Sequence, residues 1–71
     1  MEKKFIEEFI NELETKPNFK VDLNTVFRDL DDWDSMTSMM IITMIDENYN
    51  VVITPDEMLK AVTIGDLFKL I

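Results

Sequence analysis

Histidine and cysteine are both absent from this sequence. Without them the chain has no Ser-His-Asp triad, no cysteine nucleophile and no disulfide, and the usual zinc ligands are missing. Acid–base chemistry would fall to carboxylates, lysines or the one tyrosine. A chain of 71 residues buries only a marginal core, which leaves little room for an enclosed active site. We therefore expect a small protein that is not an enzyme and binds no metal.

Basic residues are scarce, since 7 Lys and Arg stand against 15 Asp and Glu for a net charge of −8. Such an acidic surface disfavours nucleic acid and anionic membranes as partners, because phosphates are bound by Lys and Arg. No segment approaches the roughly 20 apolar residues of a membrane span. The N-terminus, Met-Glu-Lys-Lys-Phe-Ile-Glu-Glu, lacks the apolar run of a signal peptide. The composition indicates a small acidic module that other proteins handle, which we expect to be monomeric, with the cytoplasm as its default location.

Glycine and proline are also rare, with one and two residues respectively, so helices should dominate over hairpins. The first helix is expected over residues 2–14, where apolar residues such as Phe5, Phe9 and Leu13 share one helical face. Pro17 then stops this helix, because the residue before a proline disfavours helical dihedral angles.

Further helices are expected over residues 36–48, 55–60 and 64–71. Asp34 or Ser35 can cap the first of these by accepting a bond from a free backbone N–H. Thr54 and Thr63 stand at the same position before the other two. The predicted fold class is all-α: a small four-helix bundle with a short third helix, formed by a single domain of residues 1–71.

The long connection over residues 16–34 is too apolar for a solvated linker. Its apolar side chains are Phe19, Val21, Leu23, Val26, Phe27 and Leu30. We expect an ordered loop that lies over the helices, with one short turn near residues 24–28. Its end is strongly acidic but lacks the glycine and glutamate that an EF-hand calcium loop requires.

The second expected helix has two apolar faces. At 100° per residue, one face holds Ile41, Ile42, Ile45 and Tyr49, which predicts a core face. The opposite side holds Met36, Met40 and Met44, joined by Thr43 and Glu47. Either the helix is buried nearly all round, or the methionines form a pliable surface for partners. We favour the second interpretation, because so small a bundle has few elements to cover both faces.

The segment Leu30-Asp-Asp-Trp-Asp-Ser35-Met36, which ends an acidic loop and opens an apolar helix, resembles the acyl carrier protein family. The segments Ile53-Thr-Pro-Asp-Glu-Met-Leu and Val62-Thr-Ile-Gly-Asp-Leu look similar to that family as well. The resemblance covers most of the chain and is weakest in the first helix. It implies that a phosphopantetheinyl transferase, using coenzyme A and Mg²⁺, joins 4′-phosphopantetheine to Ser35, with Asp34 supporting the transfer.

The resemblance further implies that the thiol of this arm holds an acyl or aminoacyl group as a thioester. Acyl-loading and acyl-transfer or condensing enzymes would then be the partners. Two alternatives remain open: an aminoacyl or D-alanyl carrier of the same fold, or an unmodified helical interaction module that docks through Met36, Met40 and Met44. By itself, Ser35 before an apolar run is more often only a helix cap.

The sequence also departs from the pattern Leu-Gly-x-Asp-Ser-Leu that is typical of fatty-acid-synthesis carriers. Asp31, Asp32 and Trp33 replace the glycine-containing turn, and Thr37 and Met40 stand where acids are usual. This indicates a dedicated carrier of a secondary pathway. We expect its partner face to comprise Trp33, Met36, Met40, Met44 and Glu47, with Trp33 half-buried and recognition only weakly dependent on salt.

Overall fold

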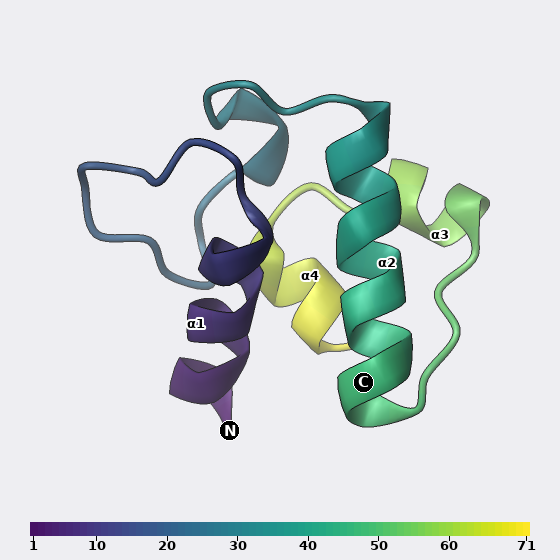
Figure 1. Cartoon of the computed structure of the whole chain (residues 1–71). Helices are drawn as coiled ribbons and strands as arrows, with labels where there is room; N and C mark the ends of the chain where they lie inside the picture. Colours follow the sequence, from purple (N-terminus) through teal and green to yellow (C-terminus); the bar gives the residue numbers. More distant parts are fainter.

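The structure is a computed structural model that describes all of residues 1–71. Its elements in chain order are α1 (Glu2–Glu12), the short 3-10 helix η1 (Phe27–Asp29), α2 (Ser35–Tyr49), α3 (Pro55–Lys60) and α4 (Ile64–Phe68). Figure 1 shows α2 as the longest helix, with α1 along one side of it and α3 on the other. The predicted all-α fold with four helices is confirmed. None of these helices has both the length and the apolar character needed to cross a bilayer.

Helix α1 ends two residues before the predicted boundary. Phe5 and Phe9, one turn apart, are fully buried, as the periodicity predicts. Leu13 leaves the helical conformation, at φ −78° and ψ 136°, and its side chain is buried in the core. The ammonium group of Lys16 then donates to three carbonyl oxygens at the end of α1. The prediction over residues 2–14 was too long by two residues, because the chain becomes extended at Leu13 and the Lys16 ammonium group takes up the free carbonyl oxygens there.

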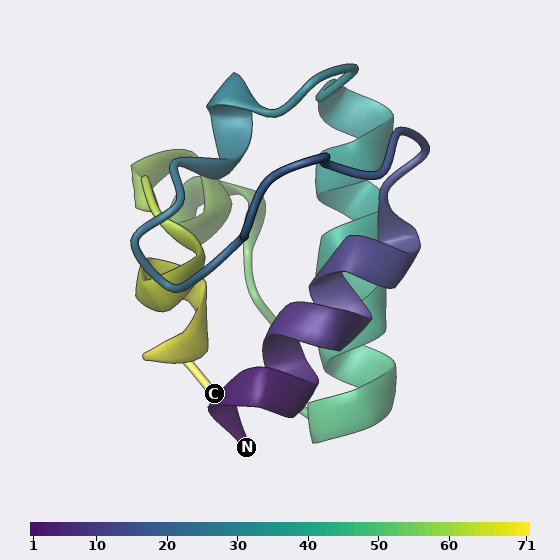
Figure 2. The same ribbon diagram turned by 90° about the vertical axis from the view of Figure 1, so that its left-hand side faces the viewer.

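The connection between α1 and α2 is the predicted ordered loop, and Figure 2 shows it crossing from α1 over to α4 and back to the start of α2. Val21, Phe27 and Leu30 are buried in the same core as the helices. The prediction fails for two of its apolar residues: Phe19 is 56% exposed, and Val26 also lies at the surface. The loop contains the short helix η1, slightly later than the expected residues 24–28, and two further turns at residues 23–24 and 31–32.

This loop is hydrogen-bonded to the start of α4. The N–H groups of Ile64 and Gly65 donate to the carbonyl oxygens of Thr25 and Leu23, at 3.0 and 2.8 Å. A Cβ atom at position 65 would lie only 2.9 Å from the Leu23 oxygen. The only glycine of the chain therefore allows a close approach of two backbone segments.

Helix α2 extends one residue beyond the prediction at each end. It ends at Asn50, which adopts a left-handed conformation at φ 59° and bonds back to the Asp46 carbonyl. Its buried residues are Thr37, Ile41, Met44 and Ile45. The prediction that Met44 lies on the exposed stripe is wrong, because Met44 is only 4% exposed and belongs to the core. Helix α1 packs against α2, and Met44 belongs to the same buried cluster as Phe5 and Phe9 of α1.

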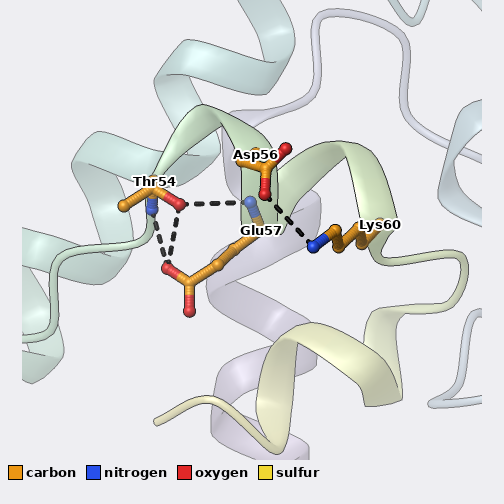
Figure 3. A network of polar contacts seen from close by, with 4 residues as sticks. All are labelled: Thr54, Asp56, Glu57 and Lys60. Carbon is orange, nitrogen blue, oxygen red and sulfur yellow. Dashed lines mark hydrogen bonds and ion pairs between the residues drawn. The ribbon is translucent and has the colours of Figure 1, made fainter.

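The two short helices start at capping boxes. In α3 the Thr54 hydroxyl accepts from the Glu57 N–H at 3.1 Å, and the Glu57 carboxylate accepts from the Thr54 N–H at 3.0 Å (Figure 3). Thr63 and Asp66 form the same motif in α4. The bounds of α3 match the prediction. Helix α4 ends at Phe68 instead of residue 71. The N–H groups of Leu70 and Ile71 donate to carbonyl oxygens three residues back, as in a 3-10 helix, instead of four residues back.

Candidate functional site

Ser35 is the first residue of α2, and its side chain is exposed. Asp34 is the N-cap: its carboxylate accepts from the Thr37 N–H at 2.8 Å and from the Thr37 hydroxyl at 2.9 Å. Of the two capping candidates in the sequence, the structure therefore uses Asp34. The Ser35 hydroxyl is left out of the cap and faces solvent, where an enzyme can reach it.

The electrostatic environment of Ser35 combines a carboxylate with the positive end of a helix. The bonds from the Thr37 N–H and hydroxyl hold the pKa of Asp34 below its usual value. Asp34 is consequently ionised at neutral pH. The helix dipole of α2, a helix of 15 residues, has its positive end at Ser35, which favours an anionic group attached there.

Trp33 anchors the loop that leads to this site. Its ring stacks on Phe9 of α1, with 5.9 Å between centroids and 8° between planes, and lies 4.9 Å from the Phe27 ring. The prediction of a half-buried Trp33 is confirmed. The preceding Asp32 has φ 61°, a left-handed conformation in which glycine is the usual residue and Asp is tolerated.

Two grooves flank the start of α2. The first lies between α2 and α3 and has a volume of about 250 Å³. It is lined by Arg28, Ser35, Ser38, Met39, Ile42, Pro55, Met58 and Leu59. The guanidinium group of Arg28 donates to the carbonyl oxygens of Met58 and Ala61 and lies 4.8 Å from the Phe27 ring centre. Arg28 thereby ties η1 to the end of α3 and holds this groove in shape.

The second groove lies between the end of α1 and the start of α2 and has a volume of about 260 Å³. It is lined by Asn11, Glu12, Leu13, Glu14, Asp34, Met36, Thr37 and Met40. Met36 is 71% exposed and Met40 is 41% exposed, so both methionines are open to a partner. Ser35 thus lies between an apolar groove on one side and a groove with carboxylates on the other.

The residues predicted for the partner face do not all gather near Ser35. Trp33, Met36 and Met40 do, whereas Met44 is buried in the core. Glu47 is exposed, but it is twelve residues further along α2, or about 18 Å at 1.5 Å per residue. The acidic residues before Ser35 do not form a group of three or more that could hold a metal ion.

Sequence reasoning missed three residues of this region. Thr37 holds the carboxylate of Asp34, and its spacing three residues after the cap was a usable signal. Met39 is 55% exposed in the α2–α3 groove, and it directly precedes Met40, which was predicted for the partner face. Arg28 gave no signal, because its partners are 30 and 33 residues away in the sequence.

Comparison with known proteins decides the family. The family model described as "Phosphopantetheine attachment site" matches residues 4–71, nearly the whole chain. This chain belongs to the phosphopantetheine attachment site family. An acyl carrier protein of Beutenbergia cavernae is 37% identical to it over 59 residues, which cover 83% of this chain and 72% of that protein. The chain matches no solved structure.

Membership in the phosphopantetheine attachment site family establishes the coarse function. The chain is a carrier protein of the acyl carrier type, with covalently attached 4′-phosphopantetheine as its prosthetic group. A carrier of this family is not itself an enzyme. It interacts with a phosphopantetheinyl transferase and with acyl-handling enzymes.

Proposed function

We propose that Ser35 carries the 4′-phosphopantetheine arm and that residues 1–71 form one carrier domain. The observation that supports this most strongly is the exposed Ser35 hydroxyl at the start of α2, next to a cap that does not use it. A phosphodiester at this position would lie at the positive end of the helix dipole. Ser38, one turn later, is half-buried in the α2–α3 groove and is a poorer acceptor.

The chain leaves the activation of Ser35 to another protein. A serine hydroxyl is a weak nucleophile without an adjacent base, and the chain contains no histidine. A phosphopantetheinyl transferase must therefore remove the proton and supply the group from coenzyme A. The ionised carboxylate of Asp34 supports this transfer beside the reacting hydroxyl.

The bound arm supplies a thiol that holds a carboxylic acid as a thioester. The α2–α3 groove next to Ser35 favours an acyl cargo over an aminoacyl one, because Met39, Ile42 and Leu59 make its walls apolar. Its volume of about 250 Å³ lies below the range of about 300–1,000 Å³ typical of ligand pockets. We therefore propose that it shelters only part of an acyl chain while the carrier moves between loading and transfer or condensing enzymes in the cytoplasm.

Intact mass tests the proposal. The protein is incubated with coenzyme A, Mg²⁺ and a broad-specificity phosphopantetheinyl transferase, beside the variants Ser35→Ala and Ser38→Ala. We expect one phosphopantetheine group and one new titratable thiol on the wild type and on Ser38→Ala, and neither on Ser35→Ala. Modification of Ser35→Ala would contradict the assignment. An unmodified wild type, with a working control carrier, would favour the alternative of an interaction module without an arm.

A further inference from the structure

Arg28 is the only arginine of the chain and the only charged residue that lines the α2–α3 groove beside Ser35. Each of the other four grooves on the surface is lined by at least two carboxylates, whereas the α2–α3 groove has none. In a protein with a net charge of −8, this groove is therefore the one hollow where an anion meets a cation without an opposing acid.

The guanidinium group of Arg28 has no carboxylate partner, because the one ion pair of the structure joins Lys60 to Asp56. Each of its two terminal nitrogens donates to a backbone carbonyl oxygen at the end of α3, one to Ala61 and the other to Met58. A guanidinium group carries five N–H donors, and these two bonds leave three of them free. Its positive charge is also left without a counter-charge, since carbonyl oxygens are neutral acceptors.

The anion that family membership brings to this place is the phosphodiester of 4′-phosphopantetheine. If it is attached to Ser35, it starts from a side chain that lines the same groove as Arg28. The free oxygens of a phosphodiester accept hydrogen bonds, and the planar fork of a guanidinium group matches phosphate geometry better than an ammonium group does. The residues present therefore fit this part of the arm.

We propose that Arg28 binds the phosphodiester of the arm on Ser35, through the N–H groups that the end of α3 leaves free. This inference rests on the proposed modification of Ser35. The bonds to Met58 and Ala61 stay in place, so one side chain joins η1, the end of α3 and the arm. The arm consequently leaves Ser35 on the α3 side, and α3 is held more firmly in the modified protein than in the unmodified one.

Nuclear magnetic resonance tests the contact in the wild type, without a variant. A single arginine gives a single guanidinium Nε–H signal, which needs no further assignment. We expect this signal to shift when a transferase adds phosphopantetheine to Ser35. The shift should diminish as salt is raised, because salt screens an ion pair of the exposed Arg28 side chain. An unchanged signal in fully modified protein would overturn the proposal.

Thermal unfolding separates phosphate binding from the bracing of α3. Modification should raise the melting temperature of the wild type by about 4 °C more than that of Arg28→Met, as expected for one exposed charge-assisted contact in so small a domain. Bracing alone would lower both forms of Arg28→Met equally and leave the gain on modification unchanged. The conservative variant Arg28→Lys should keep part of the gain, because it keeps the charge but loses the fork.

Lys60→Met is the matched control, because it removes an exposed cation of α3 that does not line the groove. Its melting temperature should gain as much from modification as that of the wild type. Equal gains in the wild type, Arg28→Met and Lys60→Met would overturn the proposal while Ser35 is still modified. A wild type that no transferase modifies would overturn the proposed function, and this inference with it.

A carboxylate on the cargo is the other anion that the arm can bring to Arg28. Proteins modified from butyryl-coenzyme A and from succinyl-coenzyme A distinguish the two sources, since these acyl groups have equal length and only the second ends in a carboxylate. We expect the guanidinium signal to lie at the same position in the unloaded, butyryl and succinyl forms. A shift that appears only in the succinyl form would assign Arg28 to the cargo and overturn its assignment to the phosphodiester.

Discussion

The two flanks of α2 differ in chemistry although they begin at the same serine. The flank towards α1 exposes Met36 and Met40 among carboxylates, and the flank towards α3 is apolar with one guanidinium group. The apolar side, whose groove Ser35 itself lines, is the one proposed to shelter part of the acyl chain. One helix presents two different sides because its neighbours supply the residues that distinguish them.

The two flanks are also held by different forces. On the α1 side, Phe9 stacks on Trp33, Phe5 meets Tyr49 edge to face at 5.8 Å, and Glu8 accepts hydrogen bonds from Asn48 and Tyr49. On the α3 side, the six-residue helix buries only Met58 and is otherwise held by its capping box and by the bonds from Arg28. We infer that the α1 side is the rigid one and that the α3 side opens more easily.

The largest effect is expected from Phe9→Ala on the rigid side. Phe9 is fully buried and contacts the rings of Phe5, Phe27 and Trp33. Its truncation should lower the free energy of unfolding by about 3–5 kcal/mol, measured by urea denaturation. Phe19→Ala is the control, because Phe19 is largely exposed and its loss should cost under about 0.5 kcal/mol. Similar losses for both variants would mean that α1 is not part of the rigid side.

An intermediate effect is expected from Arg28→Met on the α3 side, which we infer opens more easily. Removal of the guanidinium group leaves two carbonyl oxygens at the end of α3 without their donor, and should cost about 1.5–3 kcal/mol. Amide hydrogen exchange should accelerate in α3 and much less in α1. The control is Lys60→Met, which removes the exposed 3.3 Å ion pair with Asp56 shown in Figure 3 and should cost under about 1 kcal/mol. Equally accelerated amide exchange in all helices would contradict the inference that the α3 side opens separately.

The smallest effect is expected from Tyr49→Phe, which removes the hydroxyl that joins α2 to Glu8. The loss of one hydrogen bond should cost about 0.5–1.5 kcal/mol near neutral pH. Burial, together with Glu8, raises the pKa of Tyr49 from 10 to about 12. The stability linked to the neutral hydroxyl is therefore present below pH 10 and lost as pH rises towards 12. The free energies of unfolding of wild type and variant should therefore converge as the pH rises from 10 towards 12. A difference that stays constant over this range would contradict the role of the neutral hydroxyl.

Local signals predicted most of the fold. Capping residues lie next to the helices that they start, so Asp34, Thr54 and Thr63 could be found from the sequence. The errors lie where distant segments decide the outcome. The end of α1 is set by Lys16, which reaches back from the following loop, and Met44 is buried in a core that takes residues from every helix although the helical wheel left it open. A helical wheel gives angles, but it does not say where the neighbouring helix packs.

The candidate site was predictable in part for the same reason. Ser35 and Asp34 belong to one short motif at a helix start, so their neighbourhood can be read from the sequence. The two grooves cannot be predicted from this motif, because each combines residues of α2 with residues from another part of the chain. Glu12 and Glu14 come to Met36 through the packing of α1, and Arg28 comes to α3 through the path of the long loop.

Fragmentation mass spectrometry of the modified protein locates the arm most directly. Trypsin should release the peptide of residues 29–60, which contains both Ser35 and Ser38. We expect fragment ions that place the phosphopantetheine mass on Ser35 and none that place it on Ser38. A mass on any other residue would contradict the assignment of Ser35 and, with it, the role proposed for the α2–α3 groove that Ser35 lines.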